Sequence, residues 1–228
     1  MQKTQINENY FEVIDSEDKA YWLGFLYVDG CVTKDLKSII VNLSSVDYNH
    51  LKALNECMNS DYEIKYKDNN SVWLRITRKK IAKDLVDKGC TPSKSLTLQF
   101  PSEDKLSKEL QRHFIRGYFD GDGCISTILR KHKNRKNPIM ECEVNFLGTK
   151  HILENIVKII PLDNVRIFQF GKIYKFRIQN KKDIIKLMDY LYEDSHFYLQ
   201  RKFKKYNDNI KNYITKRHPL KSINILSL

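Results

Sequence analysis

The 228-residue chain has few of the residues that interrupt or crosslink a fold: 8 glycines, 5 prolines and 5 cysteines. This composition leaves no long flexible linker or low-complexity segment. The cysteines are odd in number and contain no Cys-x-x-Cys pair, which argues against a disulfide framework and against a zinc finger or ribbon. We expect buried thiols in a reducing compartment, and therefore an intracellular protein.

Long apolar runs are missing as well. No stretch reaches the ~18 consecutive apolar residues that a membrane helix needs, so we expect no membrane association. The first ten residues are polar and do not predict a signal peptide.

Positive charge is abundant, with 40 Lys and Arg against 28 Asp and Glu and a formal net charge of +12. Since 41% of the residues are hydrophobic, the sequence predicts a folded basic protein rather than a disordered basic tail. Nucleic acid is the commonest partner of such a surface, although an ordinary basic enzyme would have the same charge.

Five of the eight glycines lie in two short segments that repeat one pattern, YWLGFLYVDGCV at 21–32 and FIRGYFDGDGCI at 114–125. An offset of 93 residues, from position 29 to position 122, superposes the two segments. The coinciding positions are Gly24 and Gly117, Asp29 and Asp122, Gly30 and Gly123, and Cys31 and Cys124. Such self-similarity predicts one structural unit used twice.

The repetition continues beyond the two segments. Residues 41–43 (VNL) match residues 144–146 (VNF) at an offset of 103, and later pairs match at 102. We therefore expect the second unit to carry ten extra residues between its glycine-rich segment and the next matching strand.

Apolar periodicity and turn residues predict the same order of elements in both units. The first unit is expected to have helices at about 17–28, 47–58 and 78–88, and strands at 31–35, 38–43, 62–67 and 71–77. The second is expected to have helices at about 106–121, 149–160 and 181–192, and strands at 124–131, 139–147, 165–170 and 173–179. The predicted fold class is α+β, two pseudo-symmetric αββαββα units. We assign 1–94 to the first unit, 95–107 to a linker, and 108–228 to the second unit with its basic C-terminal tail.

The segments 24–30 (GFLYVDG) and 117–123 (GYFDGDG), each opening an αββαββα unit, resemble the two signature motifs of single-chain LAGLIDADG homing endonucleases. The resemblance covers about residues 17–205. It implies motif helices that pack together and antiparallel sheets that form a DNA-binding saddle. It also implies a monomer, needing no protein partner, that cuts both strands of a long asymmetric DNA target and leaves short 3′ overhangs. The first motif departs from the pattern at Tyr27, where the family often has the acid that Asp120 keeps.

The residue types in the two motifs also indicate a metal site without reference to the family. Gly24 and Gly117 lie on otherwise apolar faces, where a missing side chain lets two helices approach closely. If these helices pack together, Asp29 and Asp122 meet at their ends, and one pKa rises unless a cation lies between them. Carboxylate and carbonyl oxygens suit Mg²⁺ or Mn²⁺. The alternative is that each Asp-Gly pair only begins a tight turn.

The resemblance also implies further site residues. The residue before each acid offers its carbonyl to the metal, which maps to Val28 and Gly121. A divalent ion there would lower the pKa of an attacking water and stabilise the departing 3′-oxygen. One lysine per unit is implied near the scissile phosphates, and Lys94 and Lys202 are the candidates by position. Either could instead be a solvated surface lysine, and two basic neighbours compete with Lys202.

Base recognition is expected from the strands, because a two-stranded ribbon fits the major groove and alternate side chains face the DNA. The alternation places residues 72, 74 and 76, and 174, 176 and 178, toward the core. The residues expected to contact DNA are Thr33, Lys37, Asn42, Lys65, Lys67, Trp73, Arg75 and Thr77 in the first unit, and Ser126, Arg130, His132, Lys133, Asn145, Arg166, Lys175, Arg177 and Gln179 in the second. The alternative is that they form the polar faces of half-exposed sheets.

Three functions are compatible with these features. The first is a metal-dependent, site-specific endonuclease acting on double-stranded DNA. The second is a maturase that binds intron RNA on the same scaffold, and the third is a DNA-binding regulator that has lost cleavage. Retention of both Asp29 and Asp122 favours the nuclease, because binding alone gains nothing from two carboxylates that face phosphate.

Overall fold

The computed structural model describes residues 4–131, 133 and 138–211. His132, a predicted DNA contact, lies outside the described residues, as do residues 134–137. None of the described helices is long and apolar enough to span a membrane.

The predicted α+β class and the αββαββα order of both units are confirmed. The first unit consists of α1 (Glu17–Asp29), β1 (Gly30–Val32), β2 (Ile39–Ser44), η1 (Ser45–Asp47), α2 (Tyr48–Cys57), β3 (Ile64–Asp68), β4 (Ser71–Ile76), α3 (Lys79–Asp87) and η2 (Lys94–Leu96). The second unit consists of α4 (Lys108–Asp122), β5 (Cys124–Arg130), β6 (Ile139–Gly148), α5 (Lys150–Ile159), β7 (Ile167–Phe170), β8 (Ile173–Ile178), α6 (Lys181–Tyr192), α7 (Gln200–Tyr206) and the π-helical turn η3 (Asn207–Lys211).

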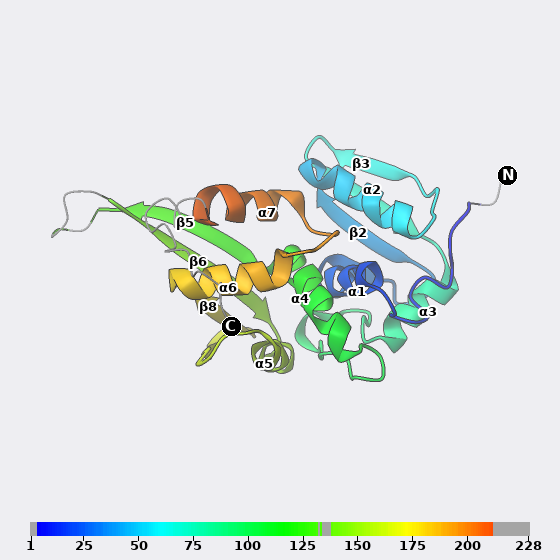
Figure 1. The fold of residues 1–228 in the computed structure, drawn as a ribbon. Coiled ribbons are helices and arrows are strands. Elements are labelled where there is room, and N and C mark those ends of the chain that lie inside the picture. Colours follow the sequence, from blue (N-terminus) through cyan, green and yellow to red (C-terminus); the bar gives the residue numbers. More distant parts are fainter. Residues whose placement is uncertain (1–3, 132, 134–137, 212–228) are drawn as a thin grey trace, which may run out of the picture.

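Each unit contains one four-stranded antiparallel sheet, ordered β1-β2-β4-β3 and β5-β6-β8-β7. Alternation along β4 buries Val72, Leu74 and Ile76 in the core, as the sequence predicts. The two units lie on either side of α1 and α4, which meet at the centre of the molecule (Figure 1). The packed helices α1 and α4 therefore support both sheets.

The strand registers correct the repeat alignment. Cys31 pairs with Ile40 in the first sheet, and Cys124 pairs with Asn145 in the second. Asn145 therefore corresponds to Ile40 at an offset of 105, not to Asn42 at 103, and the second unit carries twelve extra residues rather than ten. Side chains alternate with a period of two, so a two-residue shift keeps every residue on the same face. The apolar pattern alone cannot detect such a shift.

All five cysteines are free thiols, but their burial is only partly as expected. Cys90 and Cys142 are buried, whereas Cys31 and Cys124 are exposed. The prediction that all five are buried is therefore wrong. Cys57, in α2, is half-buried. The two exposed cysteines follow the ends of the motif helices, at outward-facing positions of β1 and β5.

Candidate functional site

The motif helices α1 and α4 cross with their backbones in contact. A Cβ atom added to Gly24 would lie 2.8 Å from the carbonyl carbon of Phe114 and 3.0 Å from the amide nitrogen of Tyr118. A Cβ atom added to Gly117 would lie 2.8 Å from the amide nitrogen of Phe25. These separations are too short for a real side chain, so the structure places each glycine where the opposite backbone passes.

This crossing brings together the two helix ends that carry Asp29 and Asp122. A Cβ atom on Gly121 would lie 3.4 Å from Oδ2 of Asp29, which shows how closely the ends approach. Burial raises the pKa of Asp29 to about 6; the charge of Lys202 opposes this rise and the charge of Asp122 adds to it. Burial also raises the pKa of Asp122, again opposed by Lys202. Neither carboxylate makes a hydrogen bond or ion pair to any residue that the structure describes.

The chemistry of these donors fits a divalent ion. Two neighbouring carboxylates that make no hydrogen bond or ion pair within the described part of the chain, one with a raised pKa, are the groups that a cation would stabilise. Gly121 packs against the side chain of Val28, so the two residues whose carbonyls are implied as ligands are neighbours across the helix pair. The described residues contain no group of three or more His, Cys, Asp or Glu side chains that could hold a metal. Phosphate and water would therefore have to complete the coordination of an oxygen-preferring ion such as Mg²⁺ or Mn²⁺.

Two buried lysines reach equivalent points beside the acids. Lys94, in η2, donates to the carbonyl of Gly30. Lys202, in α7, donates to the carbonyls of Gly123, Phe119 (2.7 Å) and Gly121 (3.4 Å), the last being a carbonyl implied as a metal ligand. Each lysine is only 7% exposed, so neither is a solvated surface lysine. Burial lowers the pKa of Lys202 to about 8 although nearby carboxylates raise it. Each unit thus places an ammonium group on the carbonyl one residue past its acid.

The basic neighbours of Lys202 point elsewhere. Arg201 pairs with Asp47 of the first unit at 2.9 Å, and Lys204 is exposed. Lys202 is therefore the only residue of these three that reaches the ends of the motif helices.

Tyr27 and Asp120 occupy equivalent positions in the two motif helices. Each makes a hydrogen bond to the backbone of the segment that leads to a buried lysine. Asp120 is fully buried and accepts hydrogen bonds from the backbone of Leu199 at 2.7 Å and from the hydroxyls of Tyr21 and Tyr192 at 2.8 and 2.6 Å. Leu199 caps α7, the helix of the second buried lysine. Tyr27 donates instead to a backbone carbonyl at the end of α3, in the segment that leads to η2. Tyr27, the residue at which the first motif departs from the family pattern, therefore holds the segment that leads to Lys94, as Asp120 holds the segment that leads to Lys202.

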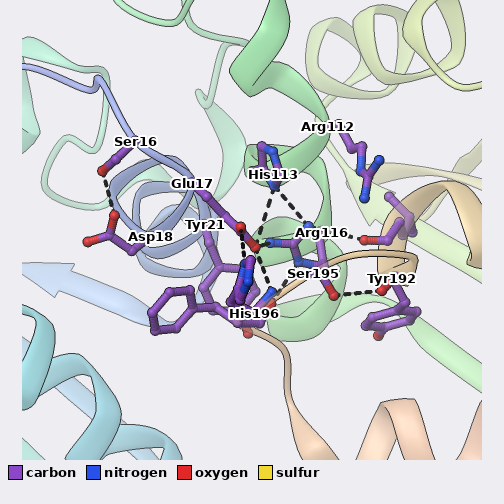
Figure 2. Close-up of polar contacts among 12 residues, drawn as sticks. Ser16, Glu17, Asp18, Tyr21, Arg112, His113, Arg116, Tyr192, Ser195 and His196 are labelled. Carbon is purple, nitrogen blue, oxygen red and sulfur yellow. Dashed lines mark hydrogen bonds and ion pairs between the residues drawn. The ribbon is translucent and has the colours of Figure 1, made fainter.

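A polar cluster around the buried Arg116, which the sequence analysis missed, joins the two units (Figure 2). Arg116 is 0% exposed and donates to Glu17 at 2.7 Å and to the carbonyl of Phe197 at 2.7 Å. Glu17 also accepts hydrogen bonds from the backbone and the ring of His196, both at 2.9 Å. The cluster fixes the segment between α6 and α7 to the start of α1. Its signal in the sequence is an arginine at the position where the first motif has Leu23.

Most of the described residues predicted to contact DNA lie on the polar faces of the two sheets or at the strand ends. Lys37 and Lys133 lie instead in the connections between β1 and β2 and between β5 and β6. Lys37, Asn42, Lys65, Lys67, Arg75, Thr77, Arg130, Lys133, Arg166, Arg177 and Gln179 are exposed, and Thr33, Trp73, Ser126 and Lys175 are half-buried. Asn145 is on the predicted face but is only 6% exposed, because it lies beside the motif-helix end and donates to Glu143 at 3.1 Å. The expectation that Asn145 is an open contact residue is therefore wrong for the free protein.

The fold matches those of several solved meganucleases. These are the LAGLIDADG meganuclease I-AabMI bound to uncleaved DNA (14% identity, 87% of this chain and 92% of that chain, TM-score 0.62), the I-SmaMI LAGLIDADG homing endonuclease bound to cleaved DNA (13%, 92% and 93%, 0.62) and the I-LtrWI LAGLIDADG homing endonuclease bound to target DNA (12%, 92% and 92%, 0.63). At this identity the similarity shows the fold, and it confirms the resemblance seen in the motifs at that level.

The sequence comparisons add one relative. No protein-family model matches the chain. The DNA-directed RNA polymerase subunit Rpo1C of Methanocaldococcus jannaschii is 27% identical over an alignment 194 residues long, which covers 79% of this chain and 22% of that protein. The chain thus spans about a fifth of the length of this curated relative.

Proposed function

We propose that the chain is a site-specific, metal-dependent endonuclease that cuts both strands of double-stranded DNA. The observation that carries this proposal is the site at the crossing of α1 and α4. Two carboxylates that bond to none of the described residues meet there, and each is flanked by a buried lysine on the carbonyl that follows it. A protein that only binds nucleic acid would lose affinity by directing two carboxylates at phosphate, so this arrangement favours cleavage over a maturase or a regulator.

The reaction is hydrolysis of one phosphodiester in each strand. A water molecule loses a proton as its oxygen bonds to phosphorus, the bond from phosphorus to the 3′-oxygen breaks, and that oxygen takes up a proton, leaving a 5′-phosphate and a 3′-hydroxyl. Asp29 and Asp122, with the carbonyls of Val28 and Gly121, would hold Mg²⁺ or Mn²⁺. Bound there, the ion would supply a water of lowered pKa and stabilise the departing oxygen.

The lysines act beside the acids. The ammonium groups of Lys94 and Lys202 would offset the negative charge that develops on the pentacovalent phosphate, one lysine for each strand. Their hydrogen bonds to Gly30 and Gly123 hold them at equivalent places in the two units. A positive charge fixed in this way needs no reorganisation when the transition state forms.

DNA would lie across both sheets, with bases read by side chains on their polar faces. Arginine can bind guanine through two hydrogen bonds, and Arg75 and Arg177 are exposed on β4 and β8. Because the two units sit in one chain and carry different side chains, the protein is proposed to act as a monomer on an asymmetric site and to leave short 3′ overhangs. The three solved structures cited above are bound to DNA, which is consistent with this use of the fold.

The test is cleavage of a randomised DNA library. The protein is first used with Ca²⁺ to enrich bound sequences, then Mg²⁺ is added and the cut ends are sequenced. We expect one asymmetric sequence with cuts in both strands, separated by a fixed number of base pairs. The double variant Asp29→Asn, Asp122→Asn is the control and should bind the same sequences without cutting them. Absence of Mg²⁺-dependent cuts, or equal cutting by the double variant, would refute the proposal.

A further inference from the structure

Glu143, on β6, is the centre of a polar network on the second sheet. Its Oε1 accepts hydrogen bonds from Asn145 at 3.1 Å and from Lys175 at 3.2 Å. Its Oε2 accepts from Gln179 at 3.1 Å and lies 3.8 Å from Nη1 of Arg177. All four partners were predicted from sequence to contact DNA, whereas Glu143 itself was not.

The four partners fill the acceptor positions of the Glu143 carboxylate, whereas the partners keep donors that Glu143 does not bind. An ionised carboxylate has about four acceptor positions, and four side chains surround this one. Lys175, Arg177 and Gln179 each keep further donors that the network does not use, and Gln179 also keeps its acceptor oxygen. Glu143 therefore organises groups that can bind bases, rather than offering an unoccupied acceptor of its own.

The first unit has no counterpart of this acid. Continuing the register in which Ile40 corresponds to Asn145, the position of Glu143 is taken by Ser38. Ser38 is buried and its hydroxyl lies 3.2 Å from that of Thr77, which corresponds to Gln179. The acidic centre is thus a feature of the second unit alone.

We propose that Glu143 is a positioning residue that sets the base preference of the second half of the DNA site. It does so by holding Lys175, Arg177 and Gln179 in one arrangement. Its single negative charge, shared between Lys175 and Arg177, also offsets one positive charge on this face, so the face binds phosphate of arbitrary sequence less strongly. Discrimination then depends more on base contacts, because a wrong sequence gains little from backbone attraction. This inference rests on the proposed reading of DNA by the sheets.

The experiment compares wild type with Glu143→Gln in a binding selection on randomised DNA in Ca²⁺. The amide keeps the shape of the side chain but cannot accept hydrogen bonds from four donors. We expect base preference to fall about tenfold at one or two base pairs in the half-site read by the second unit. Preference in the other half-site should stay unchanged and is the internal control. Affinity for non-cognate DNA should rise, with a log-log salt slope steeper by up to about 0.9.

Two further variants isolate the cause. Glu154→Gln on α5 makes the same charge change at an exposed residue that pairs with Lys150, and it should leave base preference unchanged. Gln179→Ala removes one exposed donor of the network and should relax the same base pairs to a smaller extent.

The outcomes separate this inference from the proposed function. Wild-type preference in a folded Glu143→Gln protein, or equal relaxation by Glu154→Gln, would overturn the role of Glu143. If the melting temperature shows that Glu143→Gln does not fold, Gln179→Ala becomes the deciding variant. Unchanged base preference in Gln179→Ala then overturns the inference. If wild type itself selects no sequence, the proposed function fails instead.

Discussion

The two halves of the molecule are alike where they meet and different where they face outward. At the crossing, each motif contributes a glycine under the opposite backbone, an acid at the helix end, and a lysine on the following carbonyl. On the sheets, Ser38 corresponds to Glu143 and Trp73 to Lys175, and the second unit is twelve residues longer between motif and strand. The parts that would act on the two strands of a duplex keep the internal symmetry, whereas the parts that would read bases do not.

Tyr27 and Asp120 show that one position can serve the same purpose with different chemistry. Both lie in the motif helices and bond to the segment that carries the nearby lysine. Burial raises the pKa of Asp120, and its hydrogen bonds to Tyr192 and to the backbone of Leu199 oppose that rise. A neutral phenol in one half and a carboxyl in the other therefore anchor equivalent segments, so the symmetry lies in the lysine positions rather than in the anchors.

The largest expected effect tests whether both acids are required. Asp29→Asn or Asp122→Asn should each reduce double-strand cleavage by at least about a thousandfold, because each removes one member of a unit that acts together. DNA affinity should stay the same or rise, since a carboxylate near phosphate repels it. Cleavage of a plasmid carrying the selected site, with Mg²⁺ for cutting and Ca²⁺ for binding alone, measures both quantities. Full cleavage by either single variant would contradict the symmetric mechanism.

The next effect compares the two lysines. Lys94→Met and Lys202→Met should each slow cleavage by about a hundredfold at unchanged DNA affinity. Single-turnover kinetics measure the rate, and Lys204→Met, which changes an exposed neighbour in α7, is the matched control. Weaker binding at an unchanged cleavage rate would assign the two lysines to phosphate binding instead.

The pH dependence of stability sharpens the comparison of the lysines. The pKa of Lys202 is lowered to about 8 from 10.5 by burial, so folding disfavours its charged form. The associated destabilisation is complete below about pH 8 and disappears as pH rises toward the pKa of the unfolded chain. We expect the stability of wild type relative to Lys202→Met to rise between about pH 8 and 10 in urea titrations. A constant difference would show that Lys202 is not buried in this way.

A smaller effect concerns the crossing itself. Gly24→Ala and Gly117→Ala should each destabilise the fold by about 1–3 kcal/mol, because the added methyl group overlaps the opposite backbone. Gly171→Ala is the control: no atom lies within 4 Å of its added Cβ, and only its φ of +61° costs about 1 kcal/mol. Chemical denaturation measures all three. A much smaller destabilisation for one motif glycine would show that the crossing is less symmetric than described.

The smallest effect separates phosphate contacts from base contacts. The segment 131–136 (KHKNRK), between β5 and β6, is a strongly basic loop. Neutralising its Lys131, Lys133, Arg135 and Lys136 together should weaken binding to all sequences alike. The log-log salt slope should flatten by about 0.9 for each phosphate that the loop no longer neutralises. Arg75→Ala or Arg177→Ala should instead cost about 1–3 kcal/mol at one base position. An unchanged slope in the loop variant, or a palindromic site bound by two chains, would contradict the monomeric, asymmetric reading of DNA.

Sequence reasoning predicted the elements and the acids because these depend on local patterns. Period-two alternation places the strands, and the repeated Gly and Asp-Gly spacing identifies the crossing. The register of β6 was not predictable in this way, because a shift of two residues leaves the inward and outward faces unchanged.

Other features depend on contacts between segments far apart in the chain. The partner of Arg116 is 99 residues away, at the start of α1, and Glu143 binds side chains from β8. Which buried charge meets which partner is decided by how the helices and strands pack. The exposure of Cys31 and Cys124 was not predictable for the same reason. A free cysteine is usually buried, and only the packing of the motif helices shows that these two face outward.

The direct backbone contact at Gly24 and Gly117 has a consequence for engineering. It fixes the separation of the two acids by the main chains of α1 and α4, independently of any side chain on the sheets. The number of base pairs between the two cuts should therefore be a constant of the scaffold. Redesigned sheet surfaces could then be selected for new targets without altering the length of the overhang.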